Sequence, residues 1–482
     1  MRRLLLVGLL AFAVALTGTA YAEVQSVKVS GDIDMKAINH HNYDLKKKQN
    51  NGHLGTDSAT VSDDDDASFY LSTVHVQVDA DLTDKVSTSV RLLNQRKWGQ
   101  DASATTGDVV LDNAYVVLKE FLYSPLTVKI GRQDLNYGTG FIVGPGRLAD
   151  PHGVFTDANV TPAASQNGQE YSAFNSYDAV RLILDYSPLT IEGLVAKVAE
   201  TNSSDNDTDL YGVIVNYKLD RWNAEVEPYW FYKRDQGAAV ATQDADFGAT
   251  NRTYPTNNVH TIGMRVAGSP VENLKISAEG AGQIGQMIDN TPFQKRDREG
   301  FAANVYANYT WAKVKWSPVT GAGYVYYSGE ESEDANDTAN DATDNFDAWD
   351  PMFRGQFHTF IQDFLTGFDT AAGLYTTFDA NDTSAATNRH LFYGDLALTP
   401  MQDVTLWARY THVRFAEPPA NGRSHYAGDE LDLKAIYNYT EDVQLGVFGG
   451  AFLPGKYYDE ANSNARGNDL AWTLGGGAAV KF

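Results

Sequence analysis

Hydrophobic and polar residues alternate with a period of two along most of the chain, and this pattern limits the possible folds more than any other feature. Val27, Val29, Ile33 and Met35 are separated by charged or small residues, and the segment 470–482 alternates in the same way. Successive side chains of a β-strand point to opposite faces of a sheet, so each such segment predicts a strand with one apolar and one polar face. This pattern is typical of an antiparallel sheet with one wet side.

We expect eighteen strands of this kind, and the connections between them alternate in length. Pairs such as Thr83-Asp84 and Asp220-Arg221 make tight turns, whereas 39–67, 137–174 and 329–388 are long and polar. Short turns at one end and long loops at the other are typical of outer-membrane barrels. The expected strands are 24–38, 68–82, 85–97, 109–122, 125–136, 175–186, 189–200, 208–219, 222–234, 258–268, 272–286, 299–310, 313–328, 389–398, 402–415, 428–439, 442–453 and 470–482.

The predicted fold class is therefore all-β: a transmembrane antiparallel β-barrel of about 18 strands, with long extracellular loops and short periplasmic turns. A secreted β-sandwich or solenoid would also show a period of two. A sandwich, however, buries its apolar faces and does not need short turns confined to one side of its hairpins. Aromatic residues near strand ends, such as Trp222 and Trp230, fit an interfacial girdle, and Phe482 ends the last strand on its apolar face, where it resembles a barrel insertion signal.

The N-terminus indicates export from the cytoplasm. A basic pair precedes an apolar run from Leu4 to Leu16, and Ala20-Tyr21-Ala22 offers a small-residue cleavage site. These features predict a signal peptide over residues 1–22, followed by a single barrel domain over 23–482. No later apolar stretch approaches the 18 or so residues that a transmembrane helix requires. We expect the mature protein in the cell outer membrane of a Gram-negative type envelope, after removal of the signal peptide.

Charge and cysteine content exclude several classes of function. The chain has 38 Lys and Arg against 62 Asp and Glu, a net charge of −24 that becomes −26 without the two arginines of the signal peptide. Nucleic-acid binding needs a basic surface, so we expect no nucleic-acid partner. The absence of cysteine excludes a disulfide scaffold, a thiolate zinc site and covalent c-type haem.

The acidic residues concentrate in the long loops. Residues 329–350 contain nine acidic residues and no Lys or Arg. Solvated loops are the favoured interpretation, and Ca²⁺ binding or cation bridges to lipopolysaccharide are minor hypotheses.

Four short phrases of the sequence carry a resemblance to a known family. They read Gly-Arg-Gln-Asp-Leu-Asn-Tyr-Gly over 131–138, Tyr-Asp-Ala-Val-Arg-Leu over 177–182, Trp-Asp-Pro-Met-Phe over 349–353, and Gly-Asp-Glu-Leu-Asp-Leu over 428–433. In this order they resemble the alginate export family of outer-membrane barrels. The resemblance implies an eighteen-stranded monomeric barrel whose lumen passes an anionic polysaccharide with the help of inward arginines. Its loop motif comprises Trp349, Asp350, Pro351 and Phe353.

Strand parity predicts which charged residues face the lumen. Arg91, Arg181, Arg265 and Arg409 each lie between lipid-facing apolar residues near the middle of a strand, so we expect them to point inward and form a cationic constriction. Arg132 has the parity of its lipid-facing neighbours and turns inward only if Gly131 carries a bulge, although the resemblance favours an inward position.

Acidic residues are expected at the same constriction. Asp32, Glu279 and Asp178 are the candidates. Over all the clearer strands, parity gives ten inward basic and ten inward acidic residues. Two interpretations therefore stay open: an anion-preferring constriction, or ion pairs that fill and stiffen the barrel.

We expect no enzyme activity, no cofactor and no metal. The segment 450–456 mimics a phosphate-binding loop, but Tyr457 replaces the Ser or Thr that would hold Mg²⁺. His40 and His41 are adjacent on a strand, so their side chains point to opposite faces.

The favoured function is a passive outer-membrane channel for a hydrophilic solute, anionic or saccharide. Loop 137–174 is glycine-rich at its start and is expected to fold inward and narrow the pore. The alternatives are a general porin without substrate preference, and a surface adhesion or assembly barrel with an occluded lumen that acts through loop 329–388. Expected partners are outer-membrane lipid, lipopolysaccharide and the solute, with a periplasmic partner as a further hypothesis and a monomer as the expected state.

Overall fold

The structure is a computed structural model that describes most of the predicted strands and parts of the loops. The described residues are 25–43, 45, 66–99, 109–145, 169–174, 176–199, 207–235, 240–244, 248–252, 257–288, 295–329, 345–364, 387–417, 424–460 and 469–482. The predicted signal peptide and most of the acidic segment 329–350 lie outside this part of the chain.

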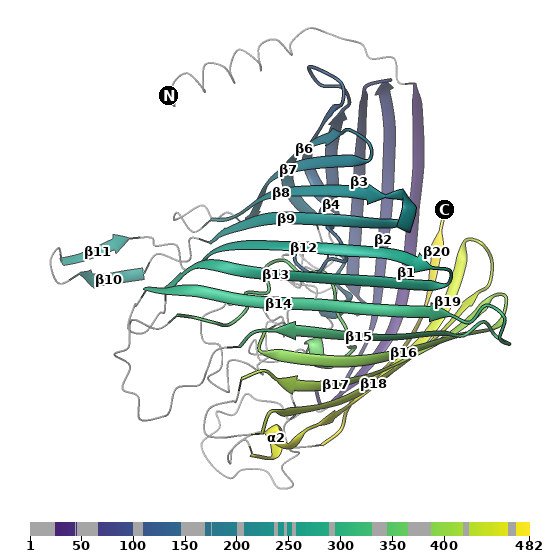
Figure 1. Ribbon diagram of the computed structural model, residues 1–482. Helices are drawn as coiled ribbons and strands as arrows, with labels where there is room; N and C mark the ends of the chain where they lie inside the picture. The colour runs from purple at the N-terminus through teal and green to yellow at the C-terminus, as the bar shows by residue number, and fades with distance from the viewer. Residues whose placement is uncertain are drawn as a thin grey trace.

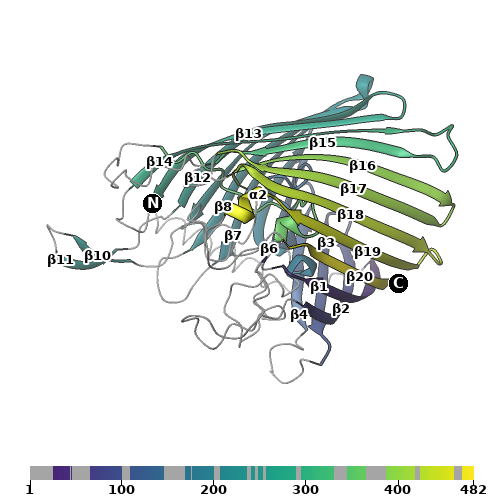
Figure 2. The same ribbon diagram turned by 90° about the horizontal axis from the view of Figure 1, so that it is seen from below.

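Eighteen strands form one antiparallel sheet that closes on itself, because β1 pairs with both β2 and β20. Figures 1 and 2 show β1 and β20 side by side, with the sheet curved around a central space. This architecture confirms the predicted barrel. Its strands are β1 (Ser26–His41), β2 (Asp66–Thr83), β3 (Val86–Lys97), β4 (Val110–Leu118), β5 (Leu126–Asp134), β6 (Ser176–Asp185), β7 (Leu189–Ala199), β8 (Thr208–Leu219), β9 (Ala224–Asp235), β12 (Asn257–Val271), β13 (Leu274–Ile288), β14 (Lys295–Thr310), β15 (Val319–Tyr327), β16 (Arg389–Met401), β17 (Val404–Phe415), β18 (Tyr426–Asn438), β19 (Val443–Pro454) and β20 (Ala471–Lys481).

The remaining elements are short. A hairpin of β10 (Val240–Asp244) and β11 (Gly248–Arg252), which the sequence did not predict, forms a separate two-stranded sheet that stands apart from the barrel in Figure 1. The helical turns are η2 (Gln169–Tyr171), η3 (Asp220–Trp222), η4 (Gln362–Phe364) and α2 (Lys456–Glu460). Within the described part of the chain, no helix is long and apolar enough to cross a membrane.

The outer face of the sheet is apolar, as the alternation predicts. Val29, Ile262 and Leu474 expose 62%, 56% and 60% of their surface, a large cost in water but a favourable contact with lipid. Phe482 also lies on this face and exchanges two backbone hydrogen bonds with Gly31, of 2.9 and 3.0 Å.

One strand boundary differs clearly from the prediction. We expected a strand from residue 313, but β15 begins at Val319 because residues 311–318 form a compact turn. The turn is closed by a hydrogen bond of 2.8 Å from Trp311 N–H to the Pro318 carbonyl, and Trp316 and Ser317 adopt positive φ angles of 69° and 42°. The apolar residues of this turn, such as Val314, had suggested a continuing strand.

The close packing of β4 against Gly131 predicts the effect of a substitution on stability. Its φ is +124°, and a Cβ added there would lie 2.2 Å from the Ala114 carbonyl oxygen, so we expect Gly131→Ala to lower the free energy of unfolding by about 1–3 kcal/mol. Gly193→Ala is the matched control, since nothing lies within 4 Å of its added Cβ. Urea titration in lipid vesicles, followed by the heat-modifiable gel shift, measures both, and equal stabilities would contradict the expectation.

Candidate functional site

Two loop segments fold into the lumen and pack against each other. We call residues 135–145 and 345–364 together the plug. They are joined by backbone hydrogen bonds from Gly144 to Phe353 (2.9 Å), from Phe353 to Ile142 (3.1 Å) and from Gly355 to Gly140 (2.7 Å). The inward course of 137–145 confirms the expectation for the start of loop 137–174; residues 146–168 lie outside the described part.

Apolar contacts hold the plug against the inner wall. Phe141 is 1% exposed and stacks on Tyr327, with ring centroids 5.6 Å apart, while Tyr137 contacts Phe231 at 5.5 Å. Leu194 and Leu391 on the wall belong to the same buried cluster. Each fully buried side chain of this size contributes about 1.5–3 kcal/mol, so the plug is bound to the wall as a hydrophobic core is.

Two of the predicted arginines bridge the wall and the plug. Arg181 donates to both oxygens of Glu192, at 2.6 and 2.8 Å, and its guanidinium lies 5.6 Å from the ring centre of Tyr137. Arg409 donates to both oxygens of Asp395, at 2.6 and 3.0 Å, and a third N–H donates to the His358 carbonyl at 3.0 Å. A bidentate guanidinium–carboxylate pair fixes the orientation of the arginine.

The other two predicted arginines are placed in the same way. Arg91 donates to Asp112 and, at 2.9 Å, to Asp134, which leads directly into the plug. Arg265 pairs with Glu225 at 2.6 Å, and its Cδ lies 2.9 Å from the point where a Cβ of Gly138 would stand.

We call Arg91, Arg181, Arg265 and Arg409 the arginine collar. Their side chains keep only 12–21% exposure, and wall carboxylates compensate every one of their charges. The collar therefore anchors the plug and also presents guanidinium edges to the remaining lumen.

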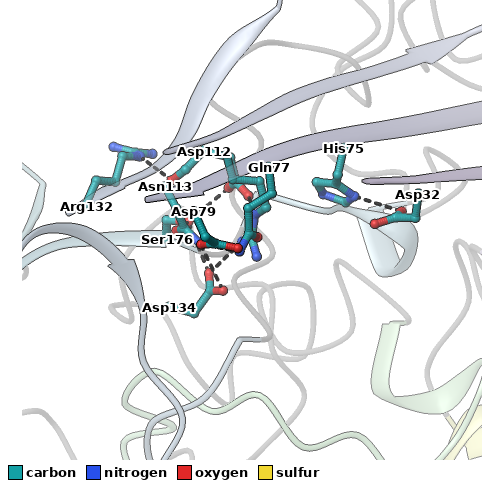
Figure 3. Close-up of polar contacts among 10 residues, drawn as sticks. Asp32, His75, Gln77, Asp79, Asp112, Asn113, Arg132, Asp134 and Ser176 are labelled. Carbon is teal, nitrogen blue, oxygen red and sulfur yellow. Dashed lines mark hydrogen bonds and ion pairs between the residues drawn. The ribbon is translucent and has the colours of Figure 1, made fainter. Parts of the chain in front are cut away.

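A polar cluster surrounds Arg91 on the inner wall. Figure 3 shows Asp112, Asn113, Asp134 and Ser176 converging, with the Asp32–His75 pair further along the wall. The Ser176 hydroxyl has oxygens of the other three within 2.8–3.2 Å. Asp112 and Asn113 are both buried because the β3–β4 register shifts there, which turns two successive side chains inward.

Glu279 lies where the plug meets the opposite wall. It pairs in register with Arg265, accepts a hydrogen bond of 2.8 Å from the Tyr229 hydroxyl, and has the Thr139 hydroxyl of the plug at 3.4 Å. Asp32, by contrast, lines an open cavity of about 590 Å³ together with Arg91, Asn136 and Pro145.

Glu430 on β18 clamps the far end of the plug. Its carboxylate accepts three backbone N–H groups, from Phe360, Ile361 and Gln362, at 2.8, 2.7 and 2.8 Å. Within the plug, Asp363 accepts the N–H groups of His358 and Thr359 at 2.6 and 3.1 Å and pairs with Arg354. Charge-assisted bonds to otherwise unpaired N–H groups make this end of the plug rigid.

The family model for alginate export matches residues 46–471 of the chain. The chain belongs to the alginate export family. The match begins well before residue 131, where the first of the four phrases starts. No curated protein matches the chain.

The chain is similar in fold to several solved structures from Pseudomonas aeruginosa. OccK3 (OpdO) has a TM-score of 0.53 and 8% identity over 96% of this chain and 97% of that one. OccK11 (OpdR) has a TM-score of 0.51 and 10% identity, over 95% and 96% of the two chains. OccK2 (OpdF), solved in complex with glucuronate, has a TM-score of 0.51 and 10% identity, over 95% and 98%. At this identity the likeness concerns the fold. Together with the family match, it makes this member of the alginate export family an outer-membrane β-barrel channel.

The four phrases shared with the alginate export family build the plug and its attachments. The first leads into the plug and supplies Asp134 and Tyr137, and the second supplies Arg181 and Tyr177, whose hydroxyl lies 3.4 Å from the Gly144 carbonyl. The third is part of the plug, and the fourth supplies the clamp Glu430.

Arg132 and Asp178 form an ion pair between β5 and β6. They lie directly opposite each other, 3.5 Å apart, and the β5–β6 register runs past Gly131 without a shift. By register they have the parity of Ile130 and Val180, which are 45% and 39% exposed, and also that of Asp134 and Ser176, which turn toward Arg91. Arg132 Nε donates to the Asp112 carbonyl at 3.2 Å, beside the polar cluster around Arg91, and its role at the constriction stays a prediction.

The loop motif lies inside the barrel. Trp349 and Asp350 are 1% and 0% exposed, Pro351 is also buried, and Phe353 is half-buried. Asp350 exchanges two hydrogen bonds of 2.8 Å with Gln283 and contacts Lys233 at 3.4 Å. These residues cannot form the surface of the adhesion hypothesis; residues 330–344 and 365–386 of that loop lie outside the described part.

Several residues of the site were not predicted. Glu192 and Asp395 have inward parity, so the same alternation could have identified them as partners of Arg181 and Arg409. Asp112 could not be found in this way because it sits in the bulge. Among the described residues, no group of three or more His, Cys, Asp or Glu is arranged to hold a metal ion.

The clamp predicts the effect of Glu430→Gln. In the variant, the NH₂ group of the new glutamine replaces the carboxylate oxygen that accepts the backbone N–H of Gln362, and an NH₂ group cannot accept a hydrogen bond. We therefore expect the attachment of the plug to weaken by about 1–3 kcal/mol. The natural chain has no cysteine, so Ile361→Cys, at a position that is 0% exposed, reports opening by its rate of thiol labelling. Labelling should accelerate in the Glu430→Gln background and not with Glu441→Gln, which alters an exposed turn; equal rates would contradict the clamp.

His358 predicts how acid affects the plug. Burial lowers the pKa of His358 to about 4, and Asp363, Arg409, Arg354 and Asp395 are the charged groups around it. Since this pKa lies below the ordinary value of 6.5, the folded plug contains the neutral imidazole of His358. The stability that this gives the folded plug is fully present above pH 6.5 and is lost as the pH falls toward about 4.

We therefore expect steady conductance at pH 7 and increasing current fluctuations as the pH approaches 4. Planar-bilayer recording across this range measures the effect, and His358→Gln should remove that acid-dependent component. An identical pH profile in both proteins would show that another group is responsible.

Proposed function

We propose that this barrel conducts a hydrophilic solute, of saccharide type or anionic, through the space between the plug and the wall. The observation that carries the proposal is that collar arginines line the cavities left there. Arg91 lines the cavity of about 590 Å³, and Arg409 lines another of about 550 Å³. Both are of the size in which proteins bind small molecules.

The chemistry of the collar suits a hydroxylated solute. Each guanidinium donates and each paired carboxylate accepts, so the two together can satisfy the donor and acceptor character of sugar hydroxyls. A carboxylate on the solute would compete for the exposed guanidinium edge. In this proposal Arg91, Arg181, Arg265 and Arg409 form the constriction, with Asp32 and Glu279 beside them, and the barrel is a non-enzymatic channel.

A general porin without preference is the second candidate. The observation in its favour is that a wall carboxylate compensates the charge of every collar arginine. Compensated pairs exert a weaker field on a passing ion than isolated cations do.

The cellular setting is part of the proposal. The apolar outer face supports direct contact with membrane lipid and lipopolysaccharide, and the basic and apolar N-terminus supports removal of residues 1–22 on export. The barrel closes within one chain, which supports a monomer. The short turns at the periplasmic end of the barrel leave that end accessible to a periplasmic partner.

Single-channel recording in a salt gradient tests the function. We expect conductance with a modest anion preference, and we expect Arg→Gln at all four collar positions to shift the reversal potential toward cations because the guanidinium edges are lost. Arg414→Gln, which changes an exposed arginine, is the control.

The outcomes separate the candidates. An absence of conductance would refute the channel, and an unchanged reversal potential in the fourfold variant would favour the general porin.

A further inference from the structure

The turn between β14 and β15 differs in charge from the other short turns of the barrel. Residues 311–318 contain two lysines, Lys313 and Lys315, and no acidic residue. The other short turns each have an acidic residue in the turn or at the strand end beside it, such as Glu120 after β4 and Asp403 after β16. Figure 1 shows the β14–β15 turn at the end of the barrel remote from β10 and β11. In a chain with a net charge of −24, this turn is a positive patch.

The two lysines of the turn have no acidic partner. Both Lys313 and Lys315 are exposed, and neither forms an ion pair with any residue that the structure describes. By contrast, Lys85 in the β2–β3 turn pairs with Glu120 at 2.6 Å. The ammonium group of Lys315 lies 5.0 Å from the ring centre of Trp316, a contact that orients the cation but does not neutralise it. An anionic group on a bound molecule would supply the missing partner.

Three large apolar side chains of the same turn are exposed. Trp311, Val314 and Trp316 expose 46%, 49% and 46% of their surface. The ring of Trp311 meets that of Tyr309 edge to face, with centroids 4.9 Å apart, and its indole N–H donates to the Thr320 hydroxyl at 2.9 Å. Tyr309 and Thr320 are register partners on the apolar outer face. Tryptophans in such a position are typical of the membrane–water interface.

Hydrogen bonds fix the shape of the turn. The Val314 N–H donates to the Trp311 carbonyl at 3.0 Å, and the Ser317 N–H donates to the Val314 carbonyl at 2.9 Å. The Thr399 N–H, near the end of β16, donates to the Trp316 carbonyl at 2.8 Å and so joins the turn to the next hairpin. Together these bonds hold Trp316 at a φ of 69°, which a bulky residue rarely adopts. The rings and the lysines are therefore presented together at the rim of the barrel.

We propose that turn 311–318 is a binding site for an anionic phospholipid of the periplasmic leaflet, with its phosphate on Lys313 and Lys315. Trp311 and Trp316 contact the glycerol and the first carbons of the acyl chains. A lysine ammonium binds phosphate as a point charge, and basic residues beside a membrane attract anionic lipids. The proposal concerns the outer wall and does not depend on what passes the lumen; it shares with the proposed function only the contact of the outer face with lipid.

An acidic protein segment is the other class of partner that two lysines could bind. The tryptophans favour lipid, because Trp311 continues the apolar outer face beyond Tyr309. A purely aqueous partner would leave the rings of Trp311 and Trp316 with no apolar surroundings.

Lipid-specific quenching tests the site on the full-length barrel. The chain has no cysteine, so Ala312→Cys, at an exposed position of the turn, carries a single bimane label. The labelled barrel is reconstituted in phosphatidylcholine vesicles with a small fraction of nitroxide-labelled phosphatidylglycerol or, in parallel, of nitroxide-labelled phosphatidylcholine. Comparison of the two lipids separates headgroup preference from the depth of the label.

We expect phosphatidylglycerol to be enriched at the label. A lysine near an anionic headgroup contributes about fivefold, so two lysines give an enrichment of roughly twentyfold. High salt should reduce the enrichment because it screens exposed charges. Equal quenching by the two lipids at low salt would overturn the proposal.

Variants locate the site. Lys313→Gln combined with Lys315→Gln should bring the quenching by the two lipids to the same level. Lys85→Gln combined with Lys119→Gln is the matched control, because it removes the same charge from exposed positions of two other turns at this end. If both double variants keep the same enrichment, the site is elsewhere. The heat-modifiable gel shift checks folding, and if the Lys313–Lys315 double variant does not fold, Lys313→Gln alone should lower the enrichment about fivefold.

Soluble poly-glutamate tests the other class of partner. If it shifts the bimane emission while phosphatidylglycerol is not enriched, the turn binds an acidic protein segment and the lipid site is refuted. Conductance enters none of these measurements. Enrichment of phosphatidylglycerol around a barrel that does not conduct would therefore uphold the site and refute the channel, whereas conductance with equal quenching would do the reverse.

Discussion

The structure depends on the pairing of every strand with two neighbours. A backbone N–H or C=O group that faces hydrocarbon without a partner costs several kcal/mol, so a sheet in a membrane has to close. Here β1 meets β20 over ten register pairs, from Asp32 with Lys481 to His41 with Trp472. Closure makes the two faces of the sheet chemically distinct, and the period-two alternation follows from that requirement.

Closure also creates an interior that has to be filled or hydrated. This chain does both, in different regions. Around Phe141 and Trp349 the lumen is packed like the core of a soluble protein, whereas the cavities beside Arg91 and Arg409 remain open. The arginine collar lies at the boundary between these regions: all four members pair with a wall carboxylate, Arg181, Arg265 and Arg409 also lie against the plug, and Arg91 holds Asp134 just before it.

The sequence was informative where one physical rule governed a residue. Alternation located all eighteen barrel strands. Parity gave the orientation of Arg181 and Arg409, because contact with lipid is the one reason for the residues beside them in the strand to be apolar. Where both the lipid and the plug require apolar side chains, the alternation of apolar and polar residues disappears. Residues 229–232 are aromatic throughout, since Tyr229 and Phe231 pack on the plug side while Trp230 and Tyr232 face outward, and no alternation remains to be read.

Two further features were beyond sequence reasoning for a different reason. The bulge at Asp112 and the unshifted register at Gly131 depend on how neighbouring strands align, and a single strand does not contain that information. The clamp from Glu430 to the plug joins residues that are about seventy positions apart, and a lone inward glutamate gives no sign of its partner.

Under the proposed function, the contacts of Arg409 with both the wall and the plug couple solute binding to the position of the plug. A carboxylate that competes for the guanidinium of Arg409 competes with Asp395 and disturbs the bond to the His358 carbonyl. Thermodynamic linkage is reciprocal. If solute binding shifts the equilibrium of the plug toward a loosened state by some factor, then loosening the plug raises the affinity for the solute by the same factor. Under the proposed function, the permeating molecule would act as its own effector.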